Sequence, residues 1–381
     1  MIKFLYTSAA VRKKTKHVLR SSYILFLTFV FLIFALPNRI FAQLNLSKEV
    51  VDTSPIELYL EMTDYIRKNG RTDSLLIKQY FDNPVVSLFK QRPGFDPQKF
   101  INSLTAVYTG KDQPMHDQDI DYGLMVKYRD NESIIRNSIK QVKNTDIESL
   151  VKKRIKPFYP NSVDIDAVKL HFVYLFIDEG NGGLPGYVFN SALQTAYLEH
   201  RNIDIISSHE AYHSITNSIF SQKYQKLLER QPNDTTTNNQ NLLWYLEIVS
   251  EEGIADLIDK DILSTTSSPL AQEIKELRNN EMSKAKRIIH QLDSLLANAQ
   301  GRLNFLTLDN IMENGGHIPG RYMSEKIKEA NLLQEYTKHT GNPFQFFYLY
   351  NKAVENKASV PKFSAASIAH LKALEASISR L

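Results

Sequence analysis

A run of apolar residues between positions 203 and 220 carries three polar residues at a fixed spacing. The run IDIISSHEAYHSITNSIF contains His209, Glu210 and His213 among isoleucines, so it predicts a buried α-helix. Positions four apart share one face of a helix, and both histidines can therefore reach the same point. Burying two imidazoles and a carboxylate without partners is costly, and a bound metal ion would remove that cost. The same spacing also arises by chance, so alone it favours a metal site without establishing one.

A second apolar helical segment offers the next ligand. Catalytic zinc usually has three protein ligands and one open position. In NLLWYLEIVSEEGIADLIDKDIL two glutamates compete: Glu252 has Asp256 four residues later on the same face, whereas Glu251 has Ala255 there. A second carboxylate one turn away can accept a hydrogen bond from the other nitrogen of a ligand histidine. The spacing therefore favours Glu252 over Glu251.

These two motifs together resemble those of the gluzincin metallopeptidases. In that family a glutamate directly before a glycine, as in EEGIAD, follows the HEAYH-type motif and supplies the third zinc ligand. The resemblance implies one zinc ion bound by His209, His213 and Glu252. It also implies Glu210 as general base and Asp256 as hydrogen-bond partner of a ligand histidine. Finally, it implies that the strands before the first motif form a sheet whose edge accepts the backbone of a substrate.

Over residues 168–330 the chain is similar to a bacterial family of exported zinc-dependent peptidases. It has His317 where that family's Tyr-any-any-Gly-any-any-Met pattern has tyrosine. Because related metallopeptidases place a tyrosine or histidine opposite the metal to stabilise the oxyanion, His317 and Tyr322 are candidates for this role. Alternatively, the glycines here only serve turn geometry and His317 is exposed. The 38 residues between His213 and Glu252 are a long insertion relative to aminopeptidase-type gluzincins, so substrate preference does not carry over.

The pattern of the remaining chain predicts the fold class. Residues 52–156 are helical in pattern, with capping signals at the start and glycines at the end of SPIELYLEMTDYIRKNG and DPQKFINSLTAVYTG. VKLHFVYLFI and GYVFNSAL are rich in β-branched and aromatic residues and predict two neighbouring strands. Helical pattern then resumes, interrupted by a polar stretch at 229–241 that predicts a loop. We therefore expect an α+β, predominantly helical protein with a zincin-like metallopeptidase core. The expected parts are a helical N-terminal part (43–160), the core with its small sheet and ligand helices (161–265), and a helical C-terminal lobe (266–381).

The first 42 residues predict a secretory signal peptide. A basic segment precedes the 14-residue apolar run YILFLTFVFLIFAL, and PNRIFAQ follows it, with cleavage expected after Ala42. The run is shorter than the roughly 20 residues of a spanning helix, and a retained membrane anchor is the alternative.

The first 42 residues hold seven basic and no acidic side chains, so the formal charge of the chain falls from +4 to −3 without them. That charge gives no reason to expect a nucleic-acid partner. The chain contains no cysteine, which excludes disulfides.

The residues together predict a zinc-dependent hydrolase, most simply a secreted or periplasmic metallopeptidase acting on peptides or proteins. Two alternatives remain. One is a non-catalytic envelope protein in which zinc only fixes the fold, which predicts a closed fourth coordination position. The other is a zinc hydrolase of a lipid or cell-wall amide or ester, which predicts an apolar or carbohydrate-shaped pocket. A membrane is a partner only if the N-terminal apolar segment is retained.

Overall fold

The computed structural model describes residues 46, 49–90, 95–110, 120–182, 184–198, 200–228, 238–263, 269–298, 305–312 and 314–379. The predicted signal segment, residues 1–42, and residues 229–237 of the predicted loop lie outside this part of the chain. Within it the protein is mostly helical with one small sheet, which confirms the α+β, predominantly helical fold class. Among the described helices, none combines the length and apolar character needed to cross a membrane.

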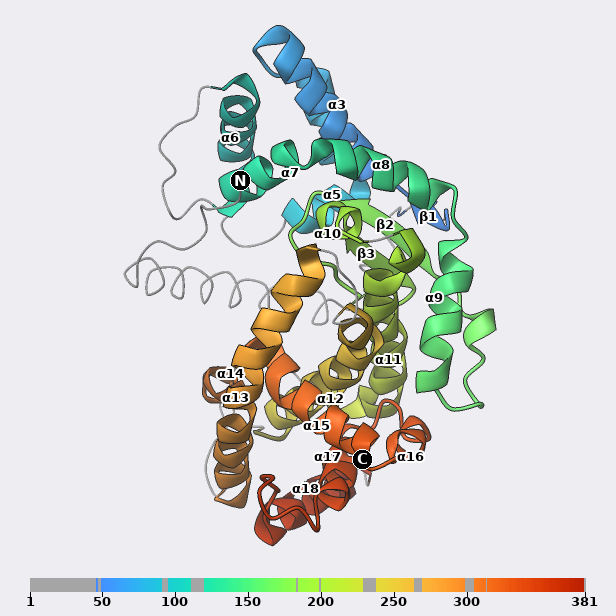
Figure 1. Cartoon of the computed structure of the whole chain (residues 1–381), viewed down its shortest axis with the longest axis vertical. Coiled ribbons are helices and arrows are strands. Elements are labelled where there is room, and N and C mark those ends of the chain that lie inside the picture. Colours follow the sequence, from blue (N-terminus) through green and yellow to red (C-terminus); the bar gives the residue numbers. More distant parts are fainter. Residues whose placement is uncertain are drawn as a thin grey trace.

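The elements follow one another in three groups along the chain (Figure 1). The first group contains β1 (Val51–Asp52), α3 (Ser54–Asn69), α4 (Ser74–Asp82), α5 (Pro84–Lys90), α6 (Pro97–Thr109), α7 (Ile120–Asp130), α8 (Glu132–Lys143) and α9 (Ile147–Ile155). The second contains β2 (His171–Leu175), β3 (Tyr187–Ser191), α10 (Ala192–Ala196), α11 (Ile205–Leu228) and α12 (Asn238–Leu263). The third contains α13 (Pro269–Ala297), α14 (Phe305–Met312), α15 (His317–Glu329), α16 (Leu333–Thr337), α17 (Pro343–Ala353) and α18 (Ala365–Ile378). Short 3-10 turns lie at η1 (Lys156–Phe158), η2 (Ile165–Ala167), η3 (His200–Asn202) and η4 (Asn314–Gly316).

Local capping explains the helix ends that the sequence predicted. Helix α3 ends at Gly70, which adopts φ 67°, a backbone conformation that favours glycine. Helix α6 starts after Asp96, whose side chain accepts hydrogen bonds from the first turn, and ends at Gly110, also at φ 67°. The end of α3 and both ends of α6 therefore lie where their cap residues indicate.

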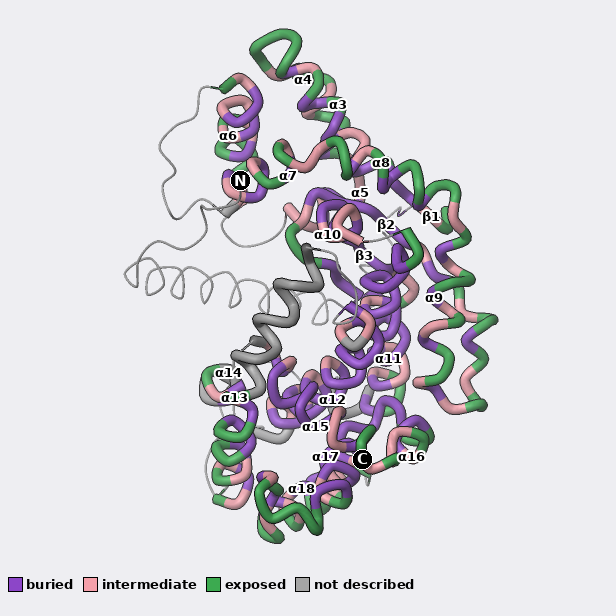
Figure 2. The backbone as a smooth tube through the Cα atoms, viewed as in Figure 1, coloured by how far each residue is buried: buried purple, intermediate pink, exposed green. Residues whose placement is uncertain are grey.

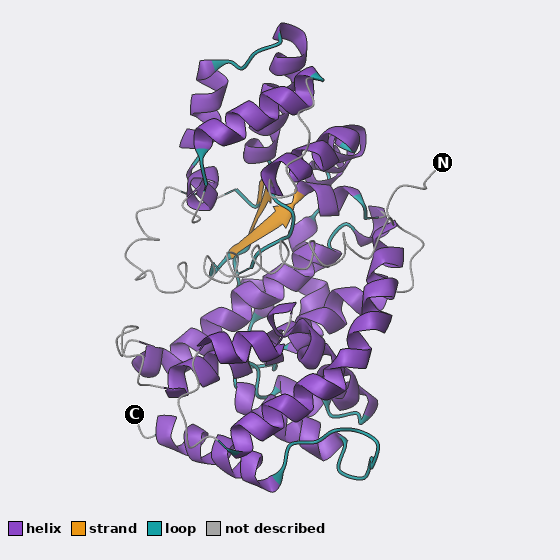
Figure 3. Ribbon diagram, turned by 90° about the vertical axis from the view of Figure 1, so that its left-hand side faces the viewer, coloured by secondary structure: helices purple, strands orange, loops and turns teal. Residues whose placement is uncertain are grey.

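The sheet has three parallel strands in the order β1-β2-β3 and lies between two groups of helices (Figure 3). Strand β2 is buried on both faces. Phe172 and Tyr174 belong to the main core, whereas Val173 and Leu175 pack in a smaller cluster with residues of α5. Burial on both faces explains the almost continuous apolar run of this strand. The two predicted strands are confirmed, and the two-residue strand β1, which the sequence did not reveal, extends the sheet.

The parallel pairing of β2 and β3 determines the path of the chain between them. To start β3 in the same direction, the chain must first run back along the sheet. Residues 179–182, the return segment, do so along the outer edge of β3. Asn181 donates a backbone hydrogen bond to the Phe189 carbonyl at 2.8 Å and accepts one from the Phe189 N–H at 2.9 Å.

The return segment also lies directly on helix α11. A Cβ atom on Gly182 would lie 1.8 Å from the carbonyl oxygen of Glu210, so only glycine permits this approach. The expected substrate-binding edge of β3 is therefore already hydrogen-bonded at Phe189. The strand edge next to the HEAYH motif belongs to the return segment instead, because the chain has to pass there to connect two parallel strands.

Helix α11, the predicted motif helix, is fixed to the sheet and to α9. Ser207 Oγ donates to the side-chain oxygen of Asn190 in β3 at 2.8 Å. At the start of the helix, the guanidinium of Arg154 in α9 holds the buried carboxylate of Asp204 through two bonds of 2.6 and 2.9 Å. These contacts set both the position and the rotation of the helix that carries the motif.

Helices α12 and α15 pack side by side, and α12 also packs on α11 (Figure 1). Helix α12 starts four residues before the predicted Leu242 and ends at Leu263 as predicted. A Cβ atom on Gly253 would lie 2.4 Å from the carbonyl oxygen of Gly320, and one on Gly320 would lie 2.3 Å from that of Val249. The two backbones are therefore in direct contact. Figure 2 colours most residues of this region as buried.

We predict that Arg154→Met lowers the free energy of unfolding by about 3–5 kcal/mol, because Asp204 is then buried without a partner charge. Asp204 is 1% exposed, so water cannot replace the guanidinium. Urea denaturation measures the effect. Asp204→Asn in the same background removes the unpaired charge and should recover much of the loss; a double variant no more stable than Arg154→Met would contradict the explanation.

We also predict that Gly253→Ala destabilises the protein by about 1–3 kcal/mol, because the added methyl group forces α12 away from α15. Gly123, inside α7, is the matched control, since no atom lies within 4 Å of its Cβ position. Gly123→Ala should stabilise by about 0.5–1 kcal/mol through helix propensity. Thermal unfolding of the two variants should thus shift Tm in opposite directions, and an unchanged Tm for Gly253→Ala would refute the close helix contact.

Candidate metal centre

Two histidines of α11 and one glutamate of α12 bring three ligand atoms together. The Nε2 atoms of His209 and His213 lie 3.0 Å apart. The Oε2 atom of Glu252 lies 3.5 Å from the first and 3.3 Å from the second. In a tetrahedral zinc site with bonds of about 2.0–2.1 Å, neighbouring ligand atoms are about 3.3 Å apart. The three distances therefore match those between the ligands of one zinc ion.

The surroundings of these atoms also fit a metal ion. The Nδ1 atom of His209 lies 3.3 Å from Oδ1 of Asp259, and that of His213 lies 3.3 Å from Oε1 of Glu251. A proton on each Nδ1 would face these carboxylates, which leaves both Nε2 lone pairs directed at each other and at Glu252. The Oε2 atom of Glu252 is buried and accepts no hydrogen bond from any residue in the described part of the chain. Three electron-rich atoms in this arrangement would be stabilised by a metal ion between them.

The pKa values of His209 and Glu252 reflect the many carboxylates around the two histidines. Burial lowers the pKa of His209, but Asp259 and Glu252 outweigh it and raise that pKa to about 10. Burial raises the pKa of Glu252, whereas His317 and His213 hold it well below its ordinary value. A metal ion here would replace the protons that these histidines otherwise take up.

Asp256 has different partners from those expected. Its Oδ1 atom contacts the ammonium group of Lys260 and lies 3.1 Å from Nδ1 of His317. The predicted hydrogen bond between Asp256 and a ligand histidine is thus corrected: Asp259 lies beside His209, and Glu251 beside His213. Asp256 still lies near His209, since ligand atoms of His209, Asp256 and Asp259 are all within 4.8 Å of one another, but its contacts at hydrogen-bonding distance are with Lys260 on α12 and His317 on α15.

Glu210 lies at the edge of the cluster beneath the return segment. Its side chain is half-buried, and a Cβ atom on Gly180 would lie 2.8 Å from its Oε1 atom. Burial raises the pKa of Glu210, while His209 and His213 oppose the increase. Glu210 is not part of any group of described residues whose atoms are close enough to share a metal ion. Glu210 is therefore a carboxylate close to the candidate ligands but outside their group.

Of the two candidates on α15, the structure brings only His317 to the cluster. Its Nδ1 atom lies 3.2 Å from Oε2 of Glu252, and the glycine turn at η4 places it at the start of the helix. Tyr322 is five residues further, about 140° around the helix. Its ring faces Lys326, and its pKa is raised by burial and then by Glu329 and Glu325. Tyr322 as a site residue therefore stays a prediction that none of its described contacts supports.

Two residues of the centre, Asp259 and Lys260, were missed although the sequence contained a signal for them. Glu252, Asp256 and Asp259 stand at positions i, i+4 and i+7, which lie on one face of a helix. Lys260 follows Asp256 by four residues, the spacing of a helical ion pair. The spacing of these four residues predicts a helix face with three carboxylates and one lysine paired to them.

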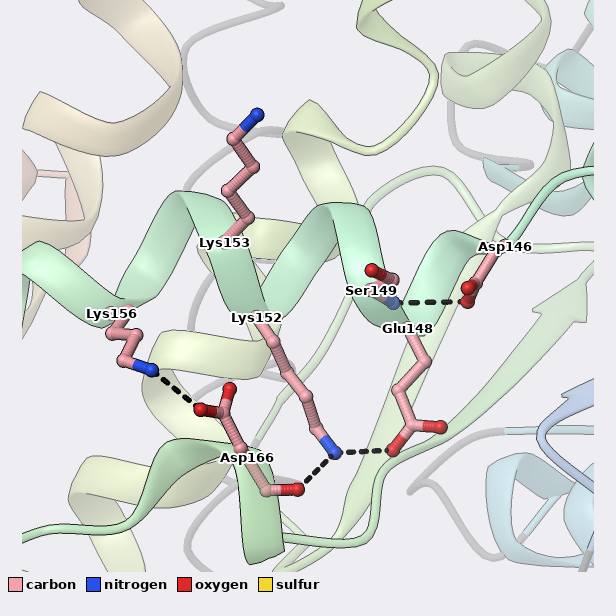
Figure 4. Close-up of a pocket in the computed structure, with 7 residues that line it drawn as sticks. All are labelled: Asp146, Glu148, Ser149, Lys152, Lys153, Lys156 and Asp166. Atoms are coloured by element: carbon pink, nitrogen blue, oxygen red, sulfur yellow. Dashed lines mark hydrogen bonds and ion pairs between the residues drawn. The ribbon is translucent and has the colours of Figure 1, made fainter.

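A surface hollow along α9 is separate from this centre (Figure 4). It has a volume of about 390 Å³ and is lined mainly by charged side chains, four of which form two ion pairs. Lys152 lies 2.7 Å from Glu148, and Lys156 lies 2.5 Å from Asp166. None of the candidate metal ligands lines it, so the hollow has no part in the site.

Comparison with known proteins identifies the family. A family model with the description "Putative zinc dependent peptidase (DUF5700)" matches residues 77–359, most of the chain. The chain belongs to this zinc-dependent peptidase family. The matched range contains both ligand helices and His317, and the family description implies peptide or protein substrates. Neither a curated protein nor a solved structure matches the chain.

The geometry predicts a ranking of zinc affinities. Glu252→Ala should lose most zinc binding because it removes a ligand. Asp259→Asn should weaken binding by about 10 to 100-fold, because His209 loses a charged partner at Nδ1. Asp256→Asn, its matched control on the same helix, should change the affinity much less. Competition against a chelating dye measures all three, and a larger loss for Asp256→Asn than for Asp259→Asn would contradict the assignment of these two partners.

Proposed function

We propose that this protein is an exported, single-zinc peptidase in which His209, His213 and Glu252 hold the ion and Glu210 is the general base. The observation that carries the proposal is the spacing of the three ligand atoms, 3.0, 3.3 and 3.5 Å. When bound, zinc would lower the pKa of a water molecule and polarise the carbonyl group of the peptide bond. The remaining tasks belong to side chains and backbone of this chain.

Glu210 is the group to accept the proton of the attacking water. It follows His209 in sequence and interacts electrostatically with both histidines, so it would lie beside a bound ion without being a ligand. Its raised pKa, caused by burial, makes it a stronger base than an exposed carboxylate. The same carboxyl group, once protonated, can donate to the leaving amine.

His317 is the group to stabilise the negative charge that develops on the substrate oxygen. It reaches the cluster from α15, with its Nδ1 atom 3.2 Å from Oε2 of Glu252 and its ring stacked on that of His209. An imidazole N–H fixed in this place before the reaction can stabilise an oxyanion without reorganising.

The return segment supplies an edge for the substrate backbone. Because the N–H and C=O groups of Asn181 are bonded to Phe189, those of Gly180 and Gly182 are directed away from β3. An extended peptide added along this second edge would pass over Glu210, against which both glycines lie. This arrangement favours a peptide over a lipid or cell-wall ester.

The proposal of export rests on the N-terminal sequence. The basic segment and the 14-residue apolar run of the first 42 residues have the order of a secretory signal. Cleavage of proteins outside the cytoplasm is then the expected setting of the reaction.

Glu210→Gln tests the mechanism. We expect the variant to keep its zinc, since no ligand is removed, and to lose about 10²- to 10⁴-fold in kcat, since an amide accepts no proton. Zinc content by mass spectrometry and cleavage of a peptide library measure the two properties. Glu335→Gln, on the surface at α16, is the control and should leave both unchanged. Undiminished turnover in Glu210→Gln would eliminate the proposed mechanism.

A further inference from the structure

Lys260 places a positive charge inside the metal centre. It lies on α12, two turns beyond Glu252, and its side chain is only 21% exposed. The ammonium group contacts the carboxylate of Asp256 and lies 3.2 Å from Nδ1 of His317. A lysine in this setting is held by its partners and does not extend into solvent.

The groups around this ammonium are themselves a set of metal ligands. The Nδ1 atom of His317 lies 3.2 Å from Oε2 of Glu252 and 3.1 Å from Oδ1 of Asp256. Ligand atoms of these three residues all lie within 4.8 Å of one another. Two carboxylates and one imidazole form a donor set that suits zinc and similar divalent ions.

A second observation marks this set as a cation site. Asp256 is 1% exposed, and its Oδ2 atom is buried without a hydrogen bond from any described residue. Glu252 belongs both to this set and to the set that it forms with His209 and His213. A shared carboxylate between two ligand sets is the arrangement in which two metal ions can lie about 3.5–4 Å apart.

We propose that the Lys260 ammonium takes the place of a second metal ion at Glu252, Asp256 and His317, and so restricts the centre to one divalent ion. The inference rests on the proposed zinc site at His209, His213 and Glu252. The ammonium neutralises Asp256, and its charge opposes the entry of a further cation at the same point. Removing it leaves two carboxylates and an imidazole ready for a divalent ion.

Zinc stoichiometry tests this proposal without reference to activity. After dialysis against a buffered zinc solution, the full chain should hold one ion per molecule and Lys260→Ala should hold two. Lys260→Arg keeps the charge and should hold one. The double variant Lys260→Ala/Asp256→Asn lacks a ligand of the second ion and should again hold one ion per molecule.

Cobalt in place of zinc provides a spectroscopic test. Lys260→Ala loaded with cobalt should show the magnetic coupling of neighbouring ions in its electron paramagnetic resonance spectrum.

Loss of Lys260 leaves Asp256 buried without its cation, so we expect Lys260→Ala to need zinc during purification in order to fold. Lys260→Gln provides a second variant, because its amide still donates to Asp256 but has no charge; it should take up a second ion more weakly. One ion per molecule in both variants, or two in the unmodified chain, would overturn the proposal. Either result would leave the first zinc site and the role of Glu210 intact, whereas an unmodified chain that binds no zinc would refute the proposed function itself.

Discussion

The structure depends on the meeting of three electron-rich atoms between α11 and α12. The Nε2 atoms of His209 and His213 face each other at 3.0 Å, and a carboxylate oxygen of Glu252 completes the triangle. Without a cation, this arrangement places lone pairs against one another in a buried region. The carboxylates behind the histidines, Asp259 and Glu251, add negative charge that a metal ion would balance. A zinc ion thus accounts at once for the spacing, the burial and the charge.

The helices can bring these atoms together because glycine allows unusually close backbone contacts. Gly253 directly follows Glu252, and its contact with Gly320 brings α15 and therefore His317 to the centre. On the other side, Gly180 and Gly182 allow the return segment to lie on Glu210. The position of each proposed catalytic group is thus linked to a nearby glycine at which a side chain would not fit.

Much of the fold and of the candidate ligand set could be predicted from local pattern. Capping residues and apolar spacing indicated the bounds of α3, α6 and the end of α12, and the i, i+4 spacing of His209 and His213 placed both on one face. The sheet was less accessible. Strand β1 has two residues, too few for a pattern, and the parallel pairing that creates the return segment depends on contacts distant in sequence.

The contacts of Asp256 and Tyr322 could not be predicted because both depend on how helices are rotated against their neighbours. The sequence placed Asp256 on the face of Glu252, which is correct, but which neighbour meets that turn follows from the contact of α12 with α15. Tyr322 lies in the same helix as His317 but points about 140° away from it. Helical periodicity identifies a face, whereas the partner of that face is a property of the tertiary structure.

Diffraction from crystals grown with zinc, recorded at the zinc absorption edge, tests the metal centre most directly. We expect one dominant anomalous peak about 2.0–2.2 Å from Nε2 of His209, Nε2 of His213 and the carboxylate of Glu252, with Glu210 nearby and not bound. A dominant peak elsewhere in the molecule, or an ion bound through Glu251 in place of Glu252, would contradict the centre described above.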